Sequence, residues 1–328
     1  MGQKHFKVGT FNLYNLIAPN VLYYDSQQYS LEEYSKKTTW IARQLDRMQV
    51  DVVGFQELFD PTALGEALAQ TERLAAAEVV CGKPSEKGPA VALASRLPVL
   101  SHQSFESFPA VALLDIEGIE LPLKRFSRPV LSVTLKLQEN LECTVFVVHL
   151  KSKRPLLPEG VDRHDPLEQA KGQARALIQR AAEVTALRVL LLEALQNRKQ
   201  PVIVLGDVND GGLAVTTQII AGEPPWHKLK LEQRQKSWDV QLYRVQDIQT
   251  RQSYGNFYYT HIHNGHHEAL DQIMVSQEFV AEHPGRVGHV TSVSVFNDHL
   301  VDETLTHDGI EPWQSDHGQV VASIKLAT

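Results

Sequence analysis

Residues 201–209 read PVIVLGDVN, a short apolar run that ends in a polar turn. The run is typical of a buried strand, and Asp207 and Asn209 point the same way if the chain stays extended. A carboxylate there can hold or deprotonate a water while the neighbouring amide binds a phosphoryl oxygen. Asp, Asn and Gly are also common in ordinary strand-ending turns. A calcium-binding EF-hand loop is excluded, because Gly211 and Gln218 stand where that loop needs calcium ligands.

The same arrangement recurs along the chain. Apolar, strand-like runs are bordered by residues that can bind a metal or transfer a proton, namely Asn12, Glu57, His149, Asp207 with Asn209, and Asp271. Ser315-Asp316-His317 directly precedes the last expected strand. Residues at strand ends can meet at one rim of a sheet. We therefore expect these scattered positions to form a single site.

Apolar patterning predicts the elements that would carry this site. Strands are expected over 6–12, 50–56, 78–81, 91–95, 130–137, 141–149, 202–205 and 320–324. Helices should begin at Ser30, with Glu33 completing a capping box, at Asp60-Pro61 and at Asp165-Pro166. Residues 258–275 are expected to form a hairpin that turns at Asn264-Gly265, and 101–127 an elaborated loop.

The third helix is expected to be long and amphipathic, although Gly172 could interrupt its start. Its inward positions would be Leu177, Ala181, Val184, Leu191 and Leu195. No low-complexity linker and no repeat of solenoid period divides the sequence. A single domain over residues 1–328 is therefore favoured.

Composition excludes several classes of protein. With 43% hydrophobic and 22% charged residues, the 328-residue chain can bury a substantial core. No segment has the roughly 20 apolar residues of a membrane span, and no signal-peptide pattern is seen, so a cytoplasmic location is the default expectation. The net charge of −7 argues against a broadly basic nucleic-acid-binding surface, but not against a local basic rim. Cys81 and Cys143 are expected to be core thiols.

Six motifs follow the order found in a known family. They are Thr10-Phe11-Asn12, Gln56-Glu57, His149-Leu150-Lys151-Ser152, Gly206-Asp207-Val208-Asn209, Leu270-Asp271-Gln272-Ile273 and Ser315-Asp316-His317. From about residue 6 to residue 325 the chain resembles the endonuclease/exonuclease/phosphatase family. The resemblance implies an α/β fold, a four-layer sandwich of two packed mixed β-sheets flanked by helices. It also implies metal-dependent hydrolysis of phosphate esters.

The resemblance further implies which residues bind metal. Asn12 and Glu57 would hold the catalytic divalent cation, usually Mg²⁺ with Mn²⁺ as an alternative, and Asp316 would support that metal or a second site. Oxygen ligands suit a hard cation that retains waters. Each residue also has a purely structural explanation. Asn12 could end a strand, Glu57 could cap the following helix, and Asp316 with His317 could form a surface turn.

The remaining matched residues would carry out the reaction. The resemblance implies that Asp207 orients or deprotonates the attacking water and that Asn209 holds the phosphate. His317, oriented by Asp271, would contact the scissile phosphate and transfer a proton. His149 would stabilise the charged transition state or assist the leaving group, although it could instead be a satisfied core histidine. These roles are chemically coherent, because an anionic phosphodiester needs donors and cations on its oxygens as well as an activated water.

The sequence departs from one branch of the family. Apurinic endonucleases carry an acidic residue two places after the asparagine of the first strand, where this chain has Tyr14. A second metal of that kind and specificity for abasic sites are therefore not expected.

The basic residues near two strand ends resemble those of the family branch that contains predicted bacterial nucleases. Arg128-Pro129 enters one expected strand, and Lys151 follows His149 at the end of another. With Lys153 and Arg154 they are candidates for a basic rim that binds a polyanionic substrate. A merely solvated charged loop explains them equally well.

Four histidines bracket the Asn264-Gly265 turn, and they are His261, His263, His266 and His267. His261 and His263 could share one face of a strand. No cysteine lies nearby, and the spacing matches no common structural zinc pattern. Substrate contact or surface exposure is therefore favoured over a zinc site.

Three functions remain open. A Mg²⁺-dependent phosphodiesterase acting on DNA or RNA leads, because its whole set of acidic and histidine positions is present. A small phosphoester or a phospholipid head group is the alternative substrate. A catalytically silent binding protein of the same fold is disfavoured, since such a protein would be expected to lose some of these positions.

Overall fold

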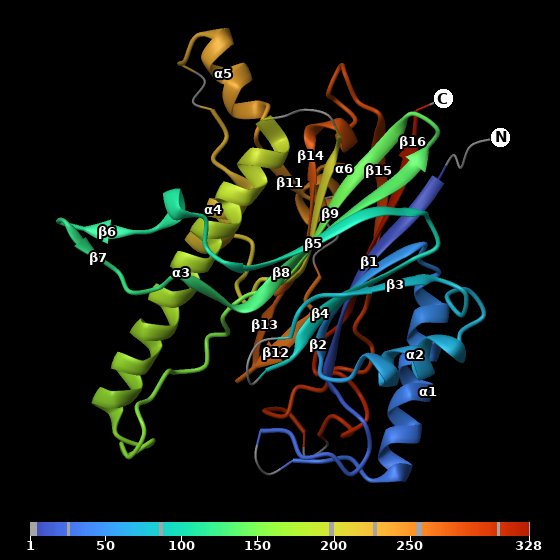
Figure 1. Cartoon of the computed structure of the whole chain (residues 1–328), viewed down its shortest axis with the longest axis vertical. Helices are drawn as coiled ribbons and strands as arrows, with labels where there is room; N and C mark the ends of the chain where they lie inside the picture. The colour runs from blue at the N-terminus through green and yellow to red at the C-terminus, as the bar shows by residue number, and fades with distance from the viewer. Residues whose placement is uncertain are drawn as a thin grey trace.

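Two six-stranded β-sheets form the centre of the structure (Figure 1). The computed structural model describes residues 5–24, 27–84, 88–196, 200–225, 228–253, 258–306 and 309–327. The first sheet has the order β15 (Gly288–Phe296), β16 (Gln319–Leu326), β1 (His5–Leu16), β2 (Val52–Leu58), β4 (Ala90–Ser95) and β3 (Glu78–Cys81). The second has the order β11 (Leu242–Arg244), β14 (Asp271–Ser276), β10 (Val202–Asp207), β9 (Leu141–His149), β8 (Arg125–Gln138) and β5 (Val99–Ser107).

Both sheets are mixed. β1 pairs with β2 and β9 pairs with β10 in parallel, while the other neighbours are antiparallel. Two small hairpins are β6 (Asp115–Ile116) with β7 (Ile119–Glu120) and β12 (His261–His263) with β13 (His266–Glu268). The helices are α1 (Leu31–Met48), α2 (Pro61–Ala69), α3 (Pro166–Gln196), α4 (Val215–Ala221), α5 (Leu231–Trp238) and α6 (Val245–Gln252), with short 3-10 turns η1 (Ala110–Ala112) and η2 (Gln277–Phe279).

Three hydrophobic clusters define the layers. One joins the two sheets and includes Val8 and Leu93 from the first and Val147 and Ile203 from the second. Another lies between the first sheet and helices α1 and α2, and a third between the second sheet and α3. The order helix, sheet, sheet, helix confirms the four-layer α/β sandwich with mixed sheets.

Alternation along the strands places the polar strand ends between the sheets. In β10, Ile203 and Leu205 belong to the inter-sheet cluster, so Asp207 continues their face. The same two-residue period leads from Val145 and Val147 of β9 to the end of that strand. The inner face that forms the core thus becomes polar at one end of the sandwich.

The predicted helix starts are confirmed. The Ser30 side chain accepts from the Glu33 backbone while Glu33 accepts from the Ser30 backbone, which completes the capping box of α1. Asp60 caps α2 by accepting from the Thr62 backbone. These hydrogen bonds satisfy backbone amides that have no partner inside the helix. Because they join residues that are close in the sequence, the sequence alone predicts where such helices begin.

The expectation of a loop over 101–127 was wrong in part. β5 covers 99–107, β6 and β7 form a hairpin over 115–120, and β8 already begins at Arg125. β5 is an edge strand whose residues are mostly exposed, so it carries no apolar alternation. β15, which begins at Gly288, also went unpredicted, and beyond Val290 its residues are only partly buried or exposed.

Two expectations for α3 were also wrong. Leu177 is 51% exposed and not inward, and Gly172 lies inside the helix without ending it. A Cβ on Gly172 would lie 2.8 Å from Leu157 Cδ2 and 2.9 Å from Pro155 Cβ, so glycine here lets the preceding loop pack against the helix. None of the described helices is long and apolar enough to cross a membrane.

The hairpin predicted over 258–275 is shorter than expected. It turns at Asn264-Gly265, but β14 leaves it to pair with β10 in the second sheet. Of the two thiols, Cys143 is buried in the inter-sheet core and Cys81 is half-buried.

Candidate active site

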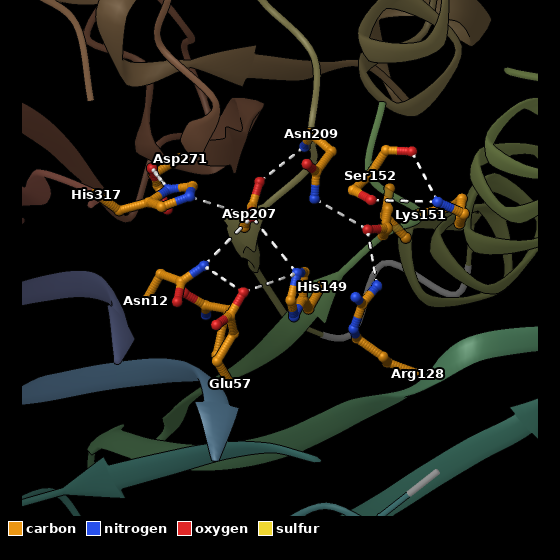
Figure 2. Close-up of polar contacts among 12 residues, drawn as sticks. Asn12, Glu57, Arg128, His149, Lys151, Ser152, Asp207, Asn209, Asp271 and His317 are labelled. Atoms are coloured by element: carbon orange, nitrogen blue, oxygen red, sulfur yellow. Dashed lines mark hydrogen bonds and ion pairs between the residues drawn. The ribbon is translucent and has the colours of Figure 1, made fainter. Parts of the chain in front are cut away.

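Three neighbouring strands of the second sheet bring three predicted site residues side by side. Asp207, the last residue of β10, is the register partner of His149 on β9 and of Asp271 on β14. All three are at most 3% exposed. Asn12 lies on β1 of the facing sheet, and its side chain reaches Asp207 (Figure 2). Both sheets therefore contribute to one polar cluster at the end of the core.

Asp207 is the centre of this cluster (Figure 2). Its Oδ2 lies 3.4 Å from Asn12 Nδ2, 3.5 Å from His149 Nε2 and 3.9 Å from His317 Nε2. Its Oδ1 accepts a 2.8 Å hydrogen bond from the Asn209 backbone. The chain is not extended at this point, because Asn209 has a φ of 58°, and the turn directs the Asn209 side-chain amide to the Leu150 carbonyl at 3.0 Å.

Backbone irregularity positions Glu57. The pairing of β2 shifts register near its end with both β1 and β4, and Glu57 has a φ of 61°. Such a bulge changes the direction of a side chain at a strand end. The carboxylate accepts from Asn15 N at 3.1 Å and from Asn12 Nδ2 at 3.4 Å, and Oε1 lies 3.9 Å from His149 Nε2. The alternative of a helix cap is excluded, since Asp60 caps α2.

His317 reaches the cluster from the loop before β16. Its Nδ1 lies 2.8 Å from Asp271 Oδ2, so this ring nitrogen carries the proton and Nε2 faces Asp207. The loop is held by Ser315, whose hydroxyl donates to the Asn12 carbonyl at 2.7 Å and accepts from His317 N at 3.0 Å. Asp316 and His317 therefore do not form a simple surface turn.

Burial and neighbouring charges set the protonation of the two histidines. Burial alone would lower the pKa of His317, but the carboxylates of Asp271 and Asp207 raise that pKa well above its ordinary value. Burial, with the Arg128 charge, lowers the pKa of His149 well below its ordinary value. The surroundings therefore favour the protonated form of His317 and the neutral form of His149.

The carboxylates are destabilised in their charged form. Burial raises the pKa of Asp207 to about 7, with Asp271 and Glu57 adding to this rise against the lowering effect of His317. Burial and the nearby Asp316 carboxylate also raise the pKa of Glu57. A buried site with several carboxylates favours a cation.

The site opens into a cleft of about 1080 Å³. Eight of the ten predicted site residues line it, and they are Glu57, Arg128, His149, Lys151, Asp207, Asn209, Asp316 and His317. Asn12 and Asp271 contact lining residues from behind. A second cavity of about 820 Å³ shares Tyr14, His261, His263, Asn264 and Asp316 with the cleft.

The basic residues that line the cleft form contacts within the protein. Arg128 Nη1 donates to the Leu150 carbonyl at 3.2 Å, and Lys151 Nζ donates to three oxygens of Ser152 and Arg154. Lys153 forms ion pairs with Glu268 at 2.5 Å and with Asp210 at 3.6 Å. These residues line the cleft together with Arg154. Carboxylates neutralise Lys153, whereas the hydrogen bonds of Arg128 and Lys151 given above go to uncharged oxygens.

A family model described as the endonuclease/exonuclease/phosphatase family matches residues 9–317. The chain belongs to this family. No curated protein matches the sequence.

Solved structures share the endonuclease/exonuclease/phosphatase fold at low sequence identity. Humanized D. rerio TDP2 with 14 mutations is 13% identical, with a TM-score of 0.58 over 98% of this chain and 100% of that chain. A Bacteroides vulgatus family protein is 14% identical, with a TM-score of 0.57 over 99% and 100%. The human Nocturnin catalytic domain with bound sulfate is 15% identical, with a TM-score of 0.56 over 99% and 96%.

The donors of this family member fit a metal ion. Among the described residues, two groups of three have ligand atoms within 4.8 Å of one another, and these are Asp207, Asp271, His317 and His261, Asp316, His317. Glu57 is in neither group but contacts Asn12 directly. The burial of Glu57 and Asp207, with their raised pKa values, matches a site in which a cation compensates the carboxylates.

Sequence reasoning missed the residues that support this family's site from outside. Glu183 of α3 is fully buried and accepts from Ser127 N at 2.9 Å and Lys151 N at 2.8 Å. Arg180 forms a 2.8 Å ion pair with Asp210 and also donates to the Lys151 carbonyl. The sequence does place these charged residues on the apolar face of a helix, but an analysis of apolar periodicity alone disregards them.

Proposed function

We propose that this chain is a Mg²⁺-dependent phosphodiesterase, with DNA or RNA as substrate and Mn²⁺ as an alternative ion. One observation carries the proposal. The cleft is lined by Glu57, Asp207 and His317, although Glu57 and His317 are 260 positions apart in the sequence. Asn12 contacts both Glu57 and Asp207, and Asp207 in turn lies beside His317.

The residues divide into a water-activating and a phosphate-binding set. Asp207 would accept a proton from the attacking water, because its pKa is raised to about 7, near the pH at which a general base is most effective. The His317 imidazolium, held by Asp271, would donate to a phosphoryl oxygen and neutralise charge that develops there. His149 would serve as a neutral hydrogen-bonding group beside Asp207.

Asn12, Glu57 and Asp316 would hold the divalent cation. When bound, such an ion supplies Lewis-acid stabilisation of a phosphoryl oxygen. Oxygen donors of this kind suit Mg²⁺, which retains several waters.

A nucleic-acid substrate is supported by the basic residues of the cleft and by a relative. Arg128, Lys151, Lys153 and Arg154 all line the cleft. D. rerio TDP2 has been solved with a single-stranded DNA product. We infer that these residues bind the phosphates that flank the scissile one.

A substrate panel tests the proposal. Purified protein is incubated with single-stranded DNA, duplex DNA, RNA and inositol phosphates, each with Mg²⁺, Mn²⁺ or Ca²⁺ or with a chelator. We expect Mg²⁺-supported cleavage of a nucleic acid, and Asp207→Asn should lower the rate by about 10²–10⁴-fold while keeping the fold. Turnover of inositol phosphate alone would transfer the assignment to small phosphoesters. Absence of hydrolysis throughout, with a folded protein, would contradict it.

A further inference from the structure

The histidines of the β12–β13 hairpin lie on two different faces of the hairpin. His261 pairs with Glu268 and His263 with His266, whereas His267 pairs with Ile262. Because cross-strand partners share a face, His261, His263 and His266 lie on one side, and all three line the cleft. His267 lies on the other side, where its ring packs against Tyr259 with centroids 4.5 Å apart.

His261 extends from this hairpin to the active-site histidine. The ring centroids of His261 and His317 are 4.7 Å apart. One ring nitrogen of each histidine and one carboxylate oxygen of Asp316 lie within 4.8 Å of one another, and His317 Nε2 is 4.0 Å from Asp316 Oδ1. Ligand atoms around a tetrahedral Zn²⁺ lie roughly 3.3 Å apart, given its bond lengths of about 2 Å. The ligand atoms would therefore have to approach one another by up to about 1.5 Å to close this triad around an ion.

Both histidines have the outer hydrogen bond that metal-binding histidines need. Nδ1 of His317 is held by the Asp271 carboxylate at 2.8 Å, and Nδ1 of His261 by the Asp316 backbone carbonyl at 3.0 Å. A carbonyl oxygen can only accept, so Nδ1 of His261 carries the proton and Nε2 carries the lone pair. A carboxylate or carbonyl on one ring nitrogen fixes the tautomer and increases the basicity of the other.

We propose that His261, Asp316 and His317 form a transition-metal site at the edge of the cleft, one that binds Zn²⁺ in preference to Mg²⁺. Two imidazoles and one carboxylate suit a borderline ion, whereas Mg²⁺ prefers oxygen ligands. Three protein ligands leave one position for water or substrate. The site borders the one assigned to Asn12 and Glu57, because Asp316 belongs to both. A metal on His317 Nε2 takes the place of the proton that the proposed hydrolysis uses, so Zn²⁺ binding and that role of His317 exclude each other.

Direct binding measurements test this site without requiring hydrolysis. Zn²⁺ alone is titrated calorimetrically into the full, untagged chain, and Mg²⁺ is titrated in parallel. We expect His261→Ala to weaken Zn²⁺ binding at least 10-fold, and Asp271→Asn by about 10–100-fold through loss of the orienting carboxylate. His267→Ala is the matched control, since it removes a histidine from the opposite face of the same hairpin. It should leave Zn²⁺ affinity within about two-fold.

A second variant guards against misfolding. His261→Asn removes the imidazole but retains a side-chain N–H donor for the Asp316 carbonyl, and circular dichroism checks that each variant is folded. Equal loss of Zn²⁺ affinity in His261→Ala and His267→Ala, or unchanged affinity in folded His261→Asn, would overturn the proposal. Because the readout is metal binding, this result is independent of whether the chain cleaves nucleic acid.

Discussion

Lys37 is a basic residue whose side chain is buried. It lies on α1, is 1% exposed, and its Nζ lies 5.4 Å from the ring of Tyr14 and 5.0 Å from the ring of Tyr29. Burial lowers the pKa of Lys37 to about 7, although Glu57 and Asp316 act to raise it. The tyrosine rings offer the charge some stabilisation, but they do not replace its hydration.

Lys37→Met should stabilise the protein in a pH-dependent manner. The unfolded chain retains the ordinary lysine pKa of 10.5, so between pH 7 and 10.5 it binds more protons than the native state. The free energy of unfolding therefore rises with pH over this window. The destabilisation caused by burying the Lys37 charge is fully present below about pH 7. The gain from Lys37→Met should be largest there, with an upper bound of about 5 kcal/mol, and should shrink toward pH 10.

Urea denaturation at about pH 6.5 and pH 9 measures this difference. Lys36→Met is the control, because Lys36 is exposed and pairs with Glu32 on the same helix. It should change the free energy of unfolding little, and by a similar amount at both pH values. A gain from Lys37→Met that is equal at both pH values would contradict the expected linkage.

At the scale of the element, the end of β10 depends on Gly206. Its φ is +139°, and a Cβ there would lie 2.0 Å from the Val148 carbonyl oxygen. This is the position directly before Asp207, where β10 pairs with both β9 and β14. Close approach of the backbones is what places the carboxylate between the two neighbouring strands.

Gly206→Ala should lower the free energy of unfolding by at least about 2 kcal/mol and displace Asp207 from its contacts. Gly65→Ala is the matched comparison, since Gly65 lies within α2 and a Cβ there meets nothing within 4 Å. It should instead stabilise the protein by about 0.5–1 kcal/mol. Chemical denaturation of both variants measures these effects, and an undestabilised Gly206→Ala would show that the strand end relaxes freely.

At the scale of the whole molecule, the two sheets share one core. Gly54 of β2 faces the second sheet so closely that a Cβ would lie 2.1 Å from Leu205 Cδ1 and 3.0 Å from Val147 Cγ1. The inter-sheet cluster draws on strands of both sheets. Without the other sheet, the apolar inner face of either sheet would be exposed to water.

We therefore expect the chain to unfold as one cooperative unit, as the hypothesis of a single domain requires. Gly54→Val should overpack the interface and lower the free energy of that single transition by about 1–3 kcal/mol. Far-UV and near-UV circular dichroism, followed together during denaturation, should give coincident midpoints in both proteins. Two separate transitions, with only one shifted by Gly54→Val, would indicate two independent units.

Much of the architecture could be predicted from local information. Capping residues marked the starts of α1 and α2, and apolar alternation marked the buried strands. Elements without a strong local signal were missed. β5 is exposed at a sheet edge, so its pairing with β8 depends on an available partner and not on its own pattern.

The sequence by itself determined which residues stand at the ends of buried strands, because a polar residue that interrupts an apolar run is visible without coordinates. Asn12, His149, Asp207 and Asp271 were identified in this way. Only the tertiary structure decided how they pair. Strand order set His149, Asp207 and Asp271 in one row, and the last loop carried His317 to Asp271 and brought Asp316 to His261. Contacts between such distant positions depend on sheet order and loop path, for which local propensity contains no information.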